Sequence, residues 1–165
     1  MLRRFVVSSA AAALLAAAPL AAQSASLKID RDGRPSVSLD AAALRKLPVD
    51  TVSMSSHGAP PVRYRAVKLL DVMAAAGSPI DSLRLGHAGW IVVAFSKDDY
   101  ITVFSAAEIE PKLGPTKVFV ALERADGPLD EKSGPFQLIV PTDQHGTRSA
   151  RMVTSLRIFD PLAKH

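Results

Sequence analysis

The sequence predicts one sheet-dominated α+β domain with a few short helices, and three observations support this prediction. The chain has 165 residues, of which 48% are hydrophobic and 22% charged, a size and composition typical of a single globular domain and not of a disordered chain. Short β-branched and aromatic runs between turn residues outnumber the segments with helical spacing. Twelve prolines and nine glycines favour many turns over a few long helices.

The N-terminal 24 residues have the layout of a cleaved export signal. A basic start with Arg3 and Arg4 precedes an apolar, alanine-rich run over 5–22, and small residues follow it. A membrane anchor is the alternative, since a span needs roughly 20 apolar residues, but the small-residue exit favours cleavage. We therefore expect residues 25–165 to form the folded domain, in the periplasm or secreted, with no membrane span after cleavage.

Charge and cysteine content exclude several classes of function. Twenty basic and sixteen acidic side chains give a net charge of +4, and loss of Arg3 and Arg4 with the signal leaves about +2. The remaining charges alternate in sign without a lysine or arginine block, so nucleic acid is not an expected partner. The chain has no cysteine, which excludes disulfides, thiolate metal sites and cysteine nucleophiles.

The first half of the expected domain combines short strands and short helices. Alternation predicts strands over 37–39 and 49–55. A helix is expected over 40–47, because its first residue is an aspartate that can accept a hydrogen bond from an unpaired backbone N–H. Helical spacing over 67–76 predicts a second helix, and Gly77 supplies a left-handed residue to end it.

The second half reads mainly as strands. Five are expected, over 90–95, 100–104, 117–122, 136–140 and 153–159. The polar residues 97–99 join the first two as a hairpin. Ser105 and Glu108 match a capping box, which predicts one helical turn after the hairpin, and residues 141–150 are expected to form a loop. In total the sequence predicts six or seven strands with two or three helices.

Three stretches share their order and spacing with a known family. They cover residues 37–48 with 64–77, residues 98–105, and residues 134–141 with the Gly-x-Arg-Ser-x-Arg motif at 146–151 and its continuation to 158. Together they resemble the molybdopterin-binding oxidoreductase domain of the sulfite oxidase superfamily, in its short exported form. The resemblance covers nearly all of the expected mature chain. It implies an α+β fold of the sulfite-oxidase molybdopterin-binding type.

The resemblance also places a catalytic centre at residues 54–58. In catalytic members a cysteine thiolate from a loop after an early strand ligates molybdenum. Here that loop reads Met, Ser, Ser, His, Gly and contains no thiolate. Neutral hydroxyls are weak ligands for a high-valent metal, so we expect a non-catalytic domain without a cofactor, with molybdopterin as the alternative. His57 is a candidate binding residue there, and an ordinary surface-loop histidine is the other interpretation.

A second candidate region is similar to the family's segment for the pterin phosphate. Arg148 and Arg151 carry forked, permanently charged guanidinium groups, and Ser149 adds a hydroxyl. A glycine turn with such donors could hold a phosphate or carboxylate even without molybdenum. His145 is a candidate for the same pocket, while its pairing with Asp143 is too small a set to predict a metal. The alternative is a solvated basic loop.

Asp98 and Asp99 at the hairpin tip have two interpretations. Burial could separate their pKa values and make them an acid and a base, or they cap the turn. The family carries a similar Asp-Tyr pair here, which implies that Tyr100 ties the hairpin to the pocket wall. Two functions remain open: binding of a small anionic ligand or a periplasmic partner protein, and a molybdopterin-dependent oxidoreductase with non-thiolate ligation.

Overall fold

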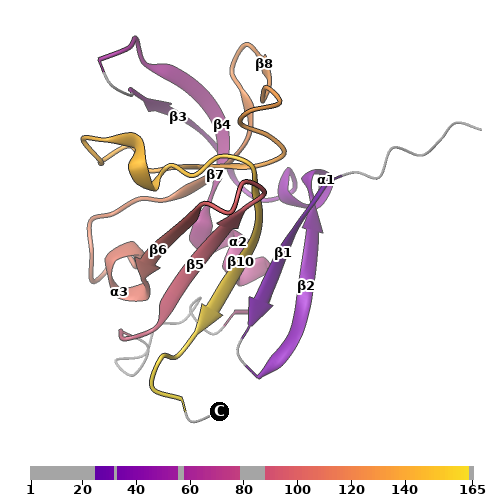
Figure 1. The fold of residues 1–165 in the computed structure, drawn as a ribbon, viewed down its shortest axis with the longest axis vertical. Coiled ribbons are helices and arrows are strands. Elements are labelled where there is room, and N and C mark those ends of the chain that lie inside the picture. Colours follow the sequence, from indigo (N-terminus) through magenta and orange to yellow (C-terminus); the bar gives the residue numbers. More distant parts are fainter. Residues whose placement is uncertain (1–24, 32, 56–57, 79–87, 164–165) are drawn as a thin grey trace, which may run out of the picture.

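The described strands form two sheets, a mixed sheet A and an antiparallel sheet B (Figure 1). The computed structural model describes residues 25–31, 33–55, 58–78 and 88–163. Sheet A has the strand order β2 (Arg34–Asp40), β1 (Ser26–Arg31), β10 (Val153–Phe159), β5 (Ile91–Ser96) and β6 (Ile101–Ser105). Sheet B has the order β3 (Val49–Met54), β4 (Val62–Lys68), β7 (Phe119–Arg124) and β8 (Gly127–Pro128), with β9 (Gln137–Ile139) also paired to β7.

Sheet A brings the two ends of the described chain together. The strands β1 and β10 are parallel neighbours, with Ile29 opposite Leu156, and the other strand pairs of the described sheets are antiparallel. A parallel pair needs a long connection, and here almost the whole domain lies between its strands. The strands β5 and β6 form the hairpin expected from the sequence.

Among the described residues, three short α-helices join the strands. They are α1 (Ala41–Leu44), α2 (Leu69–Ala75) and α3 (Ala106–Ile109). The Asp40 carboxylate accepts a hydrogen bond from the Ala43 N–H at 2.7 Å, which confirms the predicted cap. The capping box of Ser105 and Glu108 is present with both of its hydrogen bonds. Gly77 has a φ of +68° and ends α2, also as predicted.

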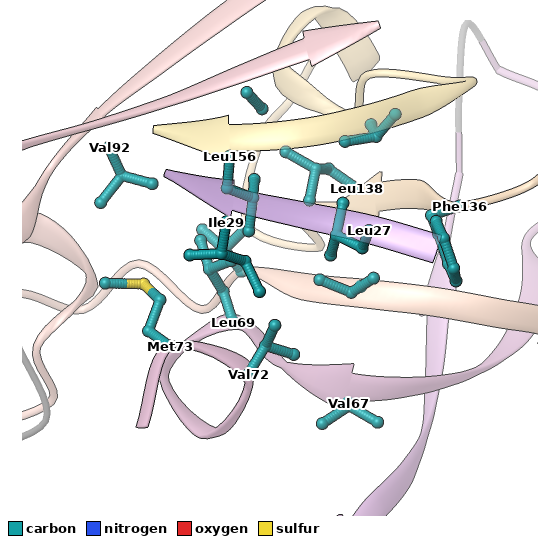
Figure 2. Close-up of a cluster of buried hydrophobic side chains, with 14 of the residues drawn as sticks. Leu27, Ile29, Val67, Leu69, Val72, Met73, Val92, Phe136, Leu138 and Leu156 are labelled. Atoms are coloured by element: carbon teal, nitrogen blue, oxygen red, sulfur yellow. The ribbon is translucent and has the colours of Figure 1, made fainter. Parts of the chain in front are cut away.

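The main hydrophobic core lies between sheet A, α2 and one face of sheet B. In Figure 2 Leu69, Val72 and Met73 of α2 face Ile29 of β1 and Leu156 of β10, and all five side chains are buried. A second cluster forms on the opposite face of sheet B, because neighbouring residues of a strand point to opposite faces. Its buried members are Val52, Tyr64, Ala66, Phe119, Ala121 and Ile139.

The sheet-dominated α+β fold is as predicted, but the strands β1, β4 and the two-residue β8 were not expected. No strand was predicted over 26–31, whereas β1 pairs with both β2 and β10. The strand β4 was also missed, and the expected helix at 67–76 starts two residues later, at Leu69. Val67 pairs with Val49 and Val120, so the ladder of sheet B prevails over the helical spacing.

The expected export signal, residues 1–24, lies outside the described residues, as does His57. Within the described ranges, no helix has both the length and the apolar character that a bilayer span requires.

Candidate functional site

The end of β3 and the segment that follows β9 meet at Ser149. The Ser149 hydroxyl accepts a hydrogen bond from the Val140 N–H at 3.0 Å and donates its proton to the Met54 sulfur at 3.0 Å. Only 6% of Ser149 is exposed. The two candidate regions of the sequence, 54–58 and 146–151, are therefore in contact through Met54 and Ser149. The single hydroxyl proton of Ser149 is already used within the chain.

Arg148 lies one residue earlier and is held by two carboxylates. Its Nε and Nη2 donate to the two oxygens of Asp143 at 2.9 and 2.7 Å, and its Nη1 donates to Glu108 at 2.8 Å. The guanidinium also lies over the Phe104 ring, 5.2 Å from the centroid. The hydrogen bonds that Arg148 donates to Asp143 raise the pKa of Arg148, burial opposes that rise, and the hydrogen bond to Glu108 adds to it. Arg148 stays charged at any accessible pH.

This arrangement changes the electrostatics expected from the sequence. One guanidinium faces two carboxylates, so the cluster of Glu108, Asp143 and Arg148 carries a formal charge of −1. Arg148 is thus neutralised inside the chain, and its fork is occupied on three of its N–H groups. An anion that approached this guanidinium would be repelled by the two carboxylates bound to it.

The other predicted site residues lie nearer the solvent. Arg151 is exposed, and no ion pair of Arg151 occurs within the described ranges. His145 is exposed at the start of a 3₁₀ turn, Gly146–Arg148. Among the basic residues of the motif, Arg151 is therefore the one whose guanidinium is open to a ligand.

Tyr100 ties the β5–β6 hairpin to this segment. Its hydroxyl donates to the Thr147 carbonyl oxygen at 2.7 Å. Asp99 adopts a left-handed φ of +64°, and the Asp98 carboxylate lies 3.4 Å from the Tyr100 N–H, as in a polar turn. The geometry favours the turn-capping interpretation of the two aspartates over an acid–base pair.

Sequence reasoning missed Glu108, Asp143 and Phe104 as the partners that hold Arg148. Glu108 was assigned only to the capping box, yet it does both tasks: its Oε1 accepts from the Ser105 N–H at 2.8 Å and its Oε2 accepts from Arg148. The capping box was the available signal, because it fixes where that carboxylate points.

The residues at this site do not fit a thiolate-ligated molybdenum centre. The sequence has no cysteine, the sulfur of Met54 is a neutral thioether, and the Ser149 hydroxyl is bound to it. Within the described part of the chain, no three His, Asp or Glu side chains gather as a metal site. Soft anionic donors are what such a centre uses from a protein, and none is available here.

Comparison with known proteins gives a likeness in structure alone. No family model matches the sequence, and no curated protein matches it. Among solved structures, the chain is similar to the sulfane dehydrogenase SoxCD from Paracoccus pantotrophus, with a TM-score of 0.61 and 18% identity. The described part of this chain therefore shares its fold with the matched part of that dehydrogenase. The match covers 82% of this chain but only 38% of the dehydrogenase chain, so it shows the fold and leaves activity open.

Proposed function

We propose that this chain is an exported, non-catalytic domain of the sulfite-oxidase type that binds a small anionic ligand. The site would lie where β3 meets the segment 146–151. The hydrogen bond from Ser149 to the Met54 sulfur carries the proposal. This hydrogen bond joins the end of β3 directly to the segment 146–151. The resemblance implies a metal–thiolate bond at the same place.

In this proposal Arg151 contacts the ligand and Arg148 is a positioning residue. Arg151 offers an exposed, permanently charged fork that suits a phosphate or a carboxylate. Arg148 holds the same segment in place through Asp143 and Glu108. His145, the other candidate from the sequence, lies exposed at the start of the 3₁₀ turn. A periplasmic partner protein with an acidic side chain at this position is the other occupant that the proposal allows.

The test is a thermal unfolding series with inorganic phosphate, pyrophosphate and citrate. A ligand that binds only the folded state at a hundred times its Kd stabilises that state by about 2.7 kcal/mol, so Tm should rise with concentration. We expect the rise in the wild-type protein and its loss in Arg151→Ala. Arg63→Ala, an exposed arginine of β4, is the matched control and should keep it. Equal shifts in both variants would overturn the role of Arg151.

A molybdopterin-dependent oxidoreductase with hydroxyl or water ligation is the second candidate, and the likeness to a sulfane dehydrogenase favours it. Elemental analysis and pterin fluorescence on the natively exported protein distinguish the two. Stoichiometric molybdenum would overturn the non-catalytic proposal. A bound pterin that is lost in Arg151→Ala would support the oxidoreductase, whereas a preparation free of metal and pterin would remove its support.

A further inference from the structure

A cavity lies between the start of α2, the end of α3 and the start of β7, and Ser149 is not part of its lining. Its volume is about 360 Å³, at the small end of the range of roughly 300–1,000 Å³ for ligand pockets. Its walls are mainly apolar, and Leu69, Ile109, Val118 and Phe119 are buried. The complete lining is Lys68, Leu69, Leu70, Ile109, Pro111, Gly114, Pro115, Thr116, Lys117, Val118 and Phe119.

The outer wall of this cavity is fixed by backbone contacts. Gly114 packs so closely on α3 that a Cβ atom there would lie 2.4 Å from the Glu108 carbonyl oxygen. The Thr116 N–H donates to that same oxygen at 3.1 Å, and the Gly114 N–H donates to the Glu110 carbonyl at 2.8 Å. Pro111 and Pro115 restrict the backbone of the same segment. The wall is thus held in one position rather than free to collapse inward.

The charges at the cavity are positive. Lys68 and Lys117 belong to the lining, and the lining includes no aspartate or glutamate. Lys68 has a long ion pair with Asp50, 3.7 Å between Nζ and Oδ2, and both side chains are exposed, so that pair contributes little. Lys117 is exposed, and no ion pair of Lys117 occurs in the ranges that the structure describes.

We propose that this cavity binds a small amphipathic anion: an apolar chain or ring inside the cavity, with one carboxylate held by Lys68 and Lys117. The apolar walls favour burial of the hydrocarbon part, at about 0.8 kcal/mol for each buried methylene. The two ammonium groups at the rim favour an anionic end over a neutral or cationic one. This site is separate from the proposed anion site at Arg151 and does not depend on it.

The test compares three ligands of equal chain length: octanoate, octanol and octylamine. We expect octanoate to bind the full folded chain most tightly in isothermal titration calorimetry, with methyl shifts at Ile109 and Val118 in NMR spectra. Octanol should bind more weakly, by about five- to tenfold, because it lacks the charge. Octylamine should bind least. Equal binding of octanoate and octylamine, or no octanoate binding at millimolar concentration, would overturn the proposal.

Two variants and one control locate the site. Lys117→Ala should weaken octanoate binding about two- to fivefold, because Lys68 remains, and leave octanol binding unchanged. Lys112→Ala, an exposed lysine of the same segment outside the lining, is the matched control and should bind octanoate as the wild type does. Leu70→Trp should fill the cavity and abolish binding of both ligands. If Leu70→Trp fails to fold, the lysine pair still decides, since equal loss in Lys117→Ala and Lys112→Ala would overturn the proposal.

Discussion

Replacement of Arg148 by methionine should destabilise the protein by about 2 kcal/mol. Methionine keeps a long apolar stem over Phe104 but removes the charge and three hydrogen bonds of 2.7 to 2.9 Å. An exposed ion pair contributes about 0–1 kcal/mol, whereas breaking a buried one costs about 3–5 kcal/mol. The side chains of Arg148, Glu108 and Asp143 are 33%, 29% and 16% exposed, so this cluster lies between those limits.

Urea unfolding of the purified protein measures this loss, and two further variants interpret it. Arg151→Met removes an exposed arginine of the same segment and should change the free energy of unfolding by less than about 0.5 kcal/mol. Arg148→Lys should recover only part of the loss, because an ammonium cannot donate in the fork that Asp143 accepts. A loss in Arg148→Met no larger than that in Arg151→Met would refute the reasoning, and Arg148 would then be free to bind a ligand.

Three other changes test separate parts of the structure, each by urea or thermal unfolding. Gly114→Ala should lower the free energy of unfolding by about 1–3 kcal/mol, because the new Cβ would lie 2.4 Å from the backbone of α3. Gly89→Ala is the control and should lower it far less, since a Cβ there has nothing within 4 Å. Similar losses in the two variants would contradict the close packing at Gly114. Ser149→Ala should cost about 1–3 kcal/mol, since it leaves the Val140 N–H unpaired, and an unchanged stability would show that this hydrogen bond is replaced. Hydrogen bonds from Lys28 and Ser36 lower the pKa of Asp30. The stability that this carboxylate contributes is therefore present above its unfolded pKa of about 3.9, and it is lost as the pH falls through the lower folded pKa. Asp30→Asn should reduce the loss of stability that the wild-type protein shows below about pH 4.

Local signals account for the parts of the fold that the sequence predicted. The capping box of Ser105 and Glu108, the cap at Asp40 and the stop at Gly77 each depend on a few neighbouring residues. The strand β10 was predicted with its observed bounds because both of its ends are β-branched or aromatic, Val153 and Thr154 at one end and Ile158 and Phe159 at the other.

The two longer strands that were missed, β1 and β4, depend on distant partners. In β1, Leu27 and Ile29 alternate with polar residues, but the strand is stabilised by β10, more than a hundred positions later. In β4, arginines alternate with Tyr64 and Ala66, a pattern that becomes a strand because β3 and β7 pair with it on either side. The partner strands of β1 and β4 cannot be identified from these segments alone, so neither strand was predicted.

The candidate site shows the same limit for side chains. The motif at 146–151 predicted which residues are basic, and its local sequence could not show that Glu108, 40 positions earlier, takes one N–H of Arg148. Asp143 was visible in the sequence but was weighed as a metal ligand beside His145. The partners of Arg148 depend on the tertiary contact that brings Glu108 of α3 to this segment.

Helix α3 contributes to both proposed sites, but through different atoms. The Glu108 side chain holds Arg148, while the Glu108 backbone carbonyl accepts from Thr116 in the wall of the apolar cavity. A side-chain substitution at this position changes the first contact and leaves the second, because the carbonyl belongs to the main chain. Anion binding at Arg151 and octanoate binding at Lys117 can therefore fail or succeed separately, and the failure of one proposal gives no reason to reject the other.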